Sequence, residues 1–206
     1  MSTAAVACEP PPTEREADAE QRFVLHGVSW DNYVALREMF DERPGLRLTY
    51  DRGTLEFMSP SPAHEDIKKC IARLLETFAL ARRVRLHGFG SATHKKRAAE
   101  KGLEPDECYF IGEIDCEFPH LAIEVALSRC GLSKLPIYQA LGVKEVWIWQ
   151  DGGLVVHAIS PDGYVTRKGS GLIAEIDLDE LAEYVRRADQ PSAVAAFFER
   201  WSRPGA

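Results

Sequence analysis

The segment HLAIEVAL, residues 120–127, is almost wholly apolar and contains a single carboxylate, Glu124. A short apolar run of this length is typical of a strand buried in a sheet. An unpaired carboxylate is costly to bury, so Glu124 requires a cation, a metal ion or a place at the rim of the sheet. The alternative is an outward-facing glutamate on an edge strand.

The segments around this strand predict the rest of the core. Apolar side chains at helical spacing over residues 67–78 predict a long amphipathic helix. Ser133 is expected to cap a second helix that Gly142 ends. The order of helices and strands predicts an α/β fold with a central mixed β-sheet flanked by helices. The other expected elements are strands at 84–89 and 108–112, a helix at 29–40, hairpins at 46–58 and 144–159, and two C-terminal helices separated at Pro191.

A chain of 206 residues is long enough for one well-buried core and short for two. Residues 1–21 combine consecutive prolines with several acids and almost no bulky apolar side chain, which predicts a disordered acidic leader. Residues 22–206 are expected to form a single domain that ends in the C-terminal helices. Residues 91–102 are expected to be a polar connection between two strands.

The formal net charge of −7 argues against a protein that coats nucleic acid or a membrane through its overall charge. No run approaches the roughly 18 apolar residues of a membrane helix, so we expect a cytoplasmic protein with no membrane contact. The five cysteines form no C-x-x-C pair, which favours reduced thiols over a disulfide framework or a zinc site.

One stretch is strongly basic. Between residues 82 and 101 there are seven basic residues and one acid. Such a patch could neutralise DNA phosphates without reading the base sequence, although a solubilising surface is an equally good interpretation. The residues expected to contact nucleic acid are Arg82, Arg83, Arg85, Lys95, Lys96 and Arg97.

Asp106 follows Pro105 at the entrance of the strand expected at 108–112. A Pro-Asp pair is often only a turn. If this strand pairs with the one that carries Glu124, however, the two carboxylates converge, and their oxygens suit Mg²⁺ or Mn²⁺. Lys134, expected in the first turn of the next helix, could orient a metal-activated water or stabilise developing negative charge, although a lone lysine there is usually only a surface residue.

Five segments, in the same order, resemble successive blocks of the Uma-two type of restriction-endonuclease-like proteins, a branch of the PD-(D/E)xK nuclease superfamily. The resemblance extends from about residue 24 to residue 200. The segments are LHGVSWDNYVALREMF, YDRGTLEFMSPSPAHE, GLEPDECYFIG, LAIEV and SKLPIYQALGVKEVWIW.

The resemblance implies roles for individual residues. Asp106 matches the aspartate of the PD element and Glu124 matches the second acid, and this pair is expected to hold the metal. The superfamily's lysine normally lies two residues beyond that acid, where this chain has Ala126, and Lys134 matches a lysine displaced onto the next helix. Ala126 and His120 also depart from the aspartates that relatives commonly show at these positions.

The implied activity is hydrolysis of phosphodiester bonds in DNA by a Mg²⁺- or Mn²⁺-dependent endonuclease. The alternative, which Ala126 favours, is a catalytically weakened nuclease fold that serves as a DNA-binding or protein-interaction module. A homodimer would let two chains act on two strands. In similar nucleases an acid on the first core helix leans toward the metal, and Glu65, or His64 beside it, fits that place; Glu56 is a weaker candidate, because alternation on a hairpin explains an outward acid.

Overall fold

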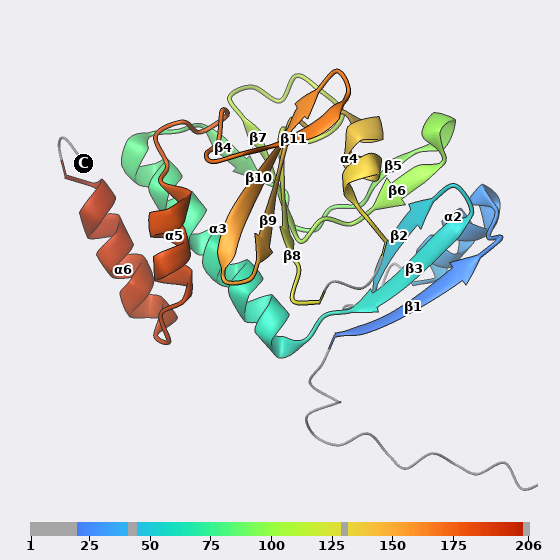
Figure 1. Ribbon diagram of the computed structural model, residues 1–206, viewed down its shortest axis with the longest axis horizontal. Helices are drawn as coiled ribbons and strands as arrows, with labels where there is room; N and C mark the ends of the chain where they lie inside the picture. The colour runs from blue at the N-terminus through green and yellow to red at the C-terminus, as the bar shows by residue number, and fades with distance from the viewer. Residues whose placement is uncertain (1–19, 41–44, 129–131, 204–206) are drawn as a thin grey trace, which may run out of the picture.

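The described residues form two β-sheets and five α-helices (Figure 1). The structure is a computed structural model and describes residues 20–40, 45–128 and 132–203. The larger sheet has the strand order β11-β10-β9-β8-β7-β4, and the smaller has the order β1-β3-β2-β6-β5. The predicted leader lies outside the described residues as far as residue 19, and its boundary at residue 21 is wrong, because Gln21 begins β1.

The larger sheet confirms the predicted α/β fold with a central mixed sheet. β8 and β9 run parallel, whereas the other neighbours in this sheet are antiparallel. The expected strands are present with bounds that differ by at most two residues, and β11 was not predicted. The strands of this sheet are β4 (Leu86–Gly88), β7 (Glu107–Ile111), β8 (Leu121–Val125), β9 (Glu145–Gln150), β10 (Gly153–Ser160) and β11 (Gly163–Arg167).

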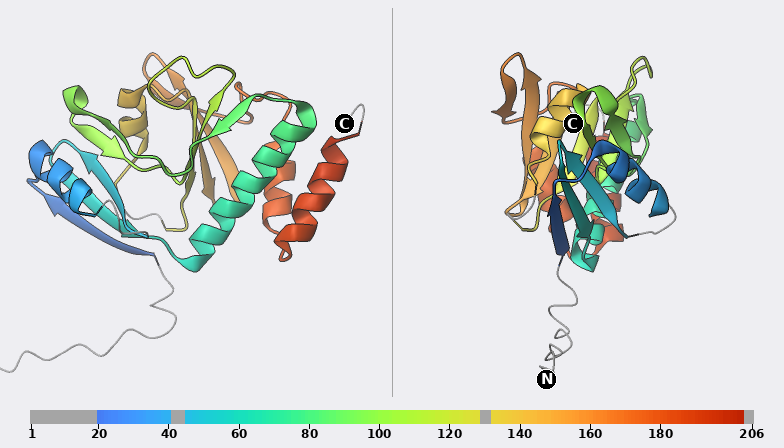
Figure 2. Two further views of the ribbon diagram at one scale, coloured as in Figure 1. Left: turned by 180° about the vertical axis from the view of Figure 1, so that it is seen from behind. Right: turned by 90° about the vertical axis from the view of Figure 1, so that its right-hand side faces the viewer.

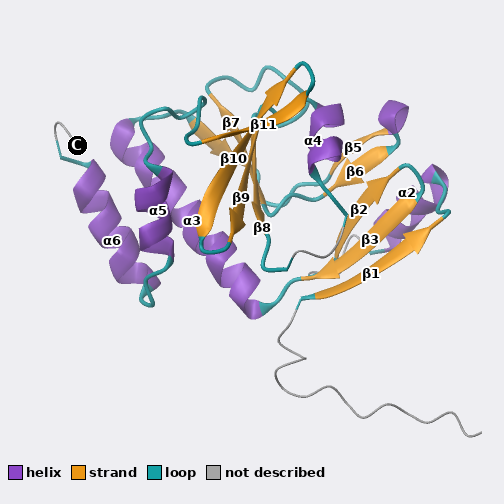
Figure 3. Cartoon of the chain, viewed as in Figure 1, coloured by secondary structure: helices purple, strands orange, loops and turns teal. Residues whose placement is uncertain are grey.

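Helices cover both faces of the larger sheet (Figure 3). On one face α3 (Pro62–Arg82), α5 (Leu178–Val185) and α6 (Gln190–Trp201) bury the main apolar core. On the other face α4 (Leu135–Leu141) packs its apolar side chains against Ala122 and Val146. The helical spacing of apolar residues in α3 therefore gives the face that the sheet buries, as the sequence predicts.

The smaller sheet is built from the predicted hairpin, β2 (Arg47–Asp51) and β3 (Thr54–Ser59), with α2 (Trp30–Met39) packed against it. Ser29 caps α2 as expected, since its hydroxyl accepts a hydrogen bond from the Asn32 amide. Three strands of this sheet were not predicted. β5 (His94–Lys96) and β6 (Lys101–Leu103), with a 3₁₀ turn at Arg97–Ala99, form where the sequence predicts only a polar connection, residues 91–102. β1 (Gln21–His26) begins at the end of the predicted leader and pairs with β3.

Two predicted helix boundaries need correction. Ser133 does not cap α4; Lys134 occupies the N-cap position and makes no side-chain capping bond. Pro191 does not separate the C-terminal helices, since it lies in the first turn of α6, where a missing amide proton costs little. Asp189 caps that helix instead.

The two sheets meet where β3 leads into α3, and the views of Figure 2 show α3 passing from the smaller sheet along the larger one. The entrance of β7, the end of β8 and the start of α4 all face this junction (Figure 1). Within the described ranges, no helix combines the length and apolar character that crossing a membrane requires.

Gly102 in β6 gives a test of how the smaller sheet packs. A β-carbon at this position would lie 2.9 Å from Tyr33 Cζ and closer still to its hydroxyl, and the Tyr33 ring is buried and stacked on Tyr50. We expect Gly102→Ala to lower the free energy of unfolding by about 1–3 kcal/mol through overpacking. Urea denaturation measures this. Gly169→Ala is the control, since a β-carbon there meets nothing within 4 Å, and equal stability of the two variants would contradict the packing.

Candidate active site

Asp106 and Glu124 come from neighbouring antiparallel strands. β7 pairs with β8 so that Glu107 lies opposite Ile123. One residue further along this register, Asp106 stands opposite Glu124, and residues directly opposite in an antiparallel pair share a face of the sheet. The amide of Val125 donates a 2.7 Å hydrogen bond to Asp106 Oδ2, which fixes the aspartate at the strand entrance.

Glu124 is buried and bound by two side chains of the following segment. Lys134 Nζ donates to its Oε2 at 2.6 Å, and the hydroxyl of Tyr138 donates to Oε1. Burial raises the pKa of Glu124, Lys134 opposes this, and the negative charge of Asp106 adds to it. Burial alone would lower the pKa of Lys134, but Glu124 and Asp106 outweigh it and raise that pKa, so the lysine stays charged. The ion pair with Lys134 therefore offsets the cost of burying the Glu124 carboxylate in this apolar strand.

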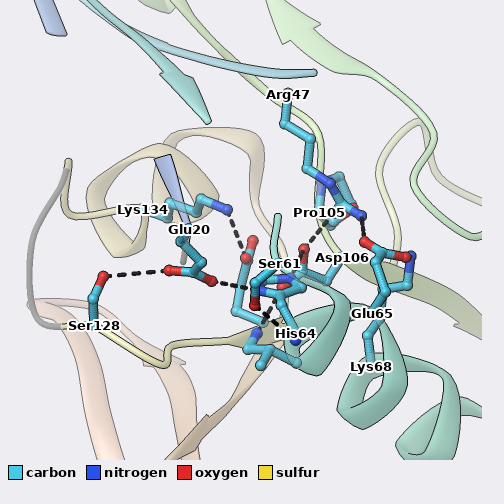
Figure 4. A network of polar contacts seen from close by, with 12 residues as sticks. Glu20, Arg47, Ser61, His64, Glu65, Lys68, Pro105, Asp106, Ser128 and Lys134 are labelled. Carbon is cyan, nitrogen blue, oxygen red and sulfur yellow. Dashed lines mark hydrogen bonds and ion pairs between the residues drawn. The ribbon is translucent and has the colours of Figure 1, made fainter. Parts of the chain in front are cut away.

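Asp106 is fully buried between two more cationic groups (Figure 4). Arg47 of β2 binds Oδ1 and also the Pro105 carbonyl. His64 Nε2 lies 3.0 Å from Oδ1, but it makes no aligned hydrogen bond within the described part of the chain, so this contact is ionic. Burial raises the pKa of Asp106, but His64, Lys134 and Arg47 outweigh it and hold that pKa well below its usual range.

A second set of charges closes the site from the smaller sheet. Glu20, just before β1, contacts His64 Nδ1 and accepts a 3.3 Å hydrogen bond from Ser128 (Figure 4). Arg22 of β1 bridges Glu20 and Glu56, and the Leu132 amide also donates to Glu56. Glu56 is 1% exposed, so the expectation of an outward-facing acid is wrong: β1 pairs with β3 and covers this position.

Glu65 and His64 occupy adjacent positions in the first turn of α3 but point to different partners. The Glu65 carboxylate contacts Arg47 at 3.1 Å and also Lys68, and its side chain is 42% exposed. Glu65 therefore joins the site through Arg47, whereas His64 is the helix residue that reaches Asp106.

The structure does not gather the six predicted DNA-contacting residues into one patch. Three lie at the end of α3 and just before β4, and three lie on or just after β5 in the other sheet, well separated in Figure 1. The first group is Arg82, Arg83 and Arg85, and the second is Lys95, Lys96 and Arg97.

Several of these cations are also neutralised by acids of the same chain. Arg82 binds Glu175 at 2.7 Å, and Arg97 binds Asp31 at 3.2 Å. Arg85 pairs with Glu113. The basic run in the sequence therefore does not translate into a single positively charged face.

His120, which departs from the family pattern, belongs to a separate cluster with Asp115 and Cys116. The Ile111 amide donates a 3.0 Å hydrogen bond to His120 Nδ1. Nε2 must then carry the proton of the neutral ring, and it points that proton toward Cys116 Sγ at 3.3 Å and Asp115 at 3.5 Å. No lone pair is left on this ring for a metal, so His120 stabilises the turn between β7 and β8.

Two pockets flank the buried acids. Glu124 and Lys134 line one of about 280 Å³ on the α4 side. Arg47, Glu65 and Lys68 line another of about 620 Å³ between α3 and the smaller sheet. The smaller pocket is the one that Glu124 lines, whereas the larger one reaches Glu65.

The donor set of these acids fits a hard divalent cation. A carboxylate offers about four acceptor positions. Asp106 Oδ2 accepts one hydrogen bond, and each oxygen of Glu124 accepts one. Each of these oxygens therefore keeps an acceptor position, and carboxylate oxygens are the ligands that Mg²⁺ and Mn²⁺ prefer.

His64 gives a prediction about pH in the metal-free protein. Burial lowers its pKa, but Asp106 and Glu20 raise it to about 9 from the usual 6.5. The raised pKa means that protonated His64 stabilises the folded state. This contribution is fully present below pH 6.5 and is lost as the pH rises toward 9. We expect a loss of roughly 2–3 kcal/mol across that range, measured by urea denaturation in EDTA.

In His64→Gln the decline above neutral pH should be absent, whereas in His26→Gln, at an exposed position of β1, it should persist. A wild-type stability that stays constant over this range would contradict a charged His64.

Four site residues were missed from the sequence: Glu20, Arg22, Arg47 and Tyr138. Arg47 carried a usable signal, since it is a cation that begins a strand of otherwise apolar character, LRLTY. Glu20 and Arg22 gave no such signal, because they lie at the end of the acidic segment of residues 1–21 and directly after it.

Comparison with known protein families finds a match over most of the chain. The family model Uma2, described as "Putative restriction endonuclease", matches residues 30–185, which is about three quarters of the chain. No curated protein matches the sequence.

Proposed function

The chain belongs to the Uma2 family, and from this premise we propose that it is a nuclease that hydrolyses phosphodiester bonds in DNA with Mg²⁺ or Mn²⁺. The observation that carries the proposal is the placement of Asp106 and Glu124 on opposed positions of neighbouring strands, with Lys134 bound to Glu124. Asp106 and Glu124 would hold the ion. When bound, it supplies Lewis acidity that polarises a phosphoryl oxygen and lowers the pKa of a water molecule.

The protein's own residues supply position and charge. The raised pKa of Lys134 keeps its ammonium charged, and beside the bound phosphate it would stabilise the negative charge that develops as water attacks phosphorus. The attack forms a P–O bond with the water oxygen, which releases a proton to solvent, and breaks the bond to the leaving oxygen, which takes up a proton from solvent. Tyr138 orients Glu124 from the opposite oxygen.

Arg47 and His64 act on Asp106 rather than on substrate. Together they lower the pKa of its carboxyl group, which keeps it ionised and ready to bind a cation at neutral pH. Glu65 supports this arrangement through Arg47. The dispersed basic residues on α3 and β5 remain candidates for contacts with DNA phosphates at two separate points.

A second function is a weakened nuclease fold that binds DNA without cutting it. Ala126 favours it, since this position lines the pocket beside Glu124 and Lys134 but offers no carboxylate. Persistent DNA binding that falls steeply with salt, in the absence of cleavage, would favour this function.

Cleavage of supercoiled plasmid and of single-stranded DNA tests the proposal. We expect the wild type to nick or linearise DNA in Mg²⁺ or Mn²⁺ and to leave it intact in EDTA, and we expect Glu124→Gln to be at least about 100-fold slower. Cleavage at the same rate by Glu124→Gln, or none by the wild type, would remove the nuclease function.

A further inference from the structure

The pocket of about 280 Å³ beside Glu124 extends well beyond that carboxylate. β8 and β9 are parallel, and Glu124 lies opposite Ile148. Val146, Ile148 and Gln150 occupy every second position of β9, so they lie on the same face of the sheet and line the pocket. Leu135 of α4 lines another side of it. The pocket therefore has a charged end at Glu124 and Lys134 and an apolar wall that leads away from it.

The charged groups of this pocket are already paired. Its cations are Lys134, which binds Glu124, and Arg22, which bridges Glu20 and Glu56. Gln150 stands at the end of β9, where its exposed side chain offers an amide donor and an amide acceptor. With the divalent ion of the proposed function held at Glu124, a ligand that fits this lining has a phosphate at that end, a flat apolar body, and a hydrogen-bonding edge. A nucleotide has these three parts.

We propose that this pocket is a nucleobase subsite, which receives the base next to the phosphate held at Glu124 and Lys134. The inference rests on the proposed nuclease function for the nature of the substrate. The volume lies just below the roughly 300–1,000 Å³ of small-molecule pockets, which suits one nucleotide and excludes a duplex. The base packs against Ile148 and Leu135, and Gln150 contacts its edge; a glutamine amide matches adenine best.

Ala126 keeps the subsite open. It lies one position along the face from Glu124 and lines this pocket and the neighbouring one. A larger side chain at this position would project into the space that the base needs. The residue that weakens the resemblance to other nucleases thus has a role in admitting substrate.

Titration calorimetry with two probes, dAMP and 2-deoxyribose 5-phosphate, tests the subsite in the full chain, in Mg²⁺ and again in EDTA. Neither probe contains a phosphodiester bond, so binding is measured without turnover. We expect dAMP to bind about tenfold more tightly than the sugar phosphate. Ala126→Leu should remove this difference and leave the affinity for the sugar phosphate unchanged. Ala195→Leu, at an exposed position of α6, is the control and should behave as the wild type.

A second variant, Gln150→Ala, tests the subsite independently in case Ala126→Leu does not fold. With dTMP as a third probe, the wild type should prefer dAMP over dTMP. Gln150→Ala should lose this preference while it binds the sugar phosphate normally. Equal affinities of the wild type for dAMP and the sugar phosphate, or an Ala126→Leu variant that folds normally and weakens both alike, would overturn the subsite. Base-dependent binding by a protein that cuts no DNA would support the subsite and overturn the nuclease function.

Discussion

Asp106→Asn is expected to abolish metal-dependent cleavage and to destabilise the fold. The substitution removes a fully buried negative charge that faces Arg47 and His64. Breaking a buried ion pair by removing one partner costs about 3–5 kcal/mol, because the remaining charge stays buried. His64 can relieve part of this cost by losing its proton, so we expect the lower end of the range. Urea denaturation and plasmid cleavage measure the two effects.

The control for Asp106→Asn is Asp66→Asn. Asp66 is exposed on α3, two residues after His64, and within the described part of the chain it receives a long hydrogen bond from Gln190. Its replacement should change stability by less than about 0.5 kcal/mol and leave cleavage unchanged. If Asp106→Asn cuts DNA as fast as Asp66→Asn, Asp106 has no part in the reaction.

Lys134→Met is expected to separate catalysis from metal binding. Methionine has similar length without the charge, so the variant loses the cation that pairs with Glu124 at 2.6 Å. Asp106 and Glu124 keep their oxygens, and we expect Mn²⁺ binding to persist. The cleavage rate should fall by roughly 10²–10³, the effect of removing one group that stabilises the transition-state charge. Single-turnover cleavage at saturating metal measures the rate.

Lys144→Met provides the matched comparison, since Lys144 is exposed just before β9. It should cut at the wild-type rate. Loss of Mn²⁺ binding in a folded Lys134→Met variant would show that the lysine orders the acids rather than acting in the reaction.

The acids could be predicted from the sequence because their relation is local. Asp106 and Glu124 belong to consecutive strands that pair with each other, so an acid at one strand entrance and an acid inside the next must meet. Lys134 begins the following helix and folds back onto Glu124. A buried carboxylate needs a cation, a metal ion or a place at the rim of the sheet, and in the structure Lys134 supplies the cation.

The groups that enclose the acids could not be predicted, since they depend on how the smaller sheet folds over the larger one. Arg47 is separated from Asp106 by 59 positions in the chain. Glu20 reaches His64 only because β1 pairs with β3. The basic residues show the opposite relation: they are neighbours in the sequence, but the chain runs from the end of α3 to β5 in the other sheet and separates them in space.

Titration of the purified protein with Mn²⁺ tests the central claim most directly, because it asks whether Asp106 and Glu124 together bind a divalent cation. Isothermal titration calorimetry of the wild type should give saturable binding. A folded Glu124→Gln variant should bind at least about tenfold more weakly, and the Asp106→Asn, Glu124→Gln double variant should show no binding. Equal Mn²⁺ affinity in the wild type and the double variant would contradict a metal site at these two carboxylates.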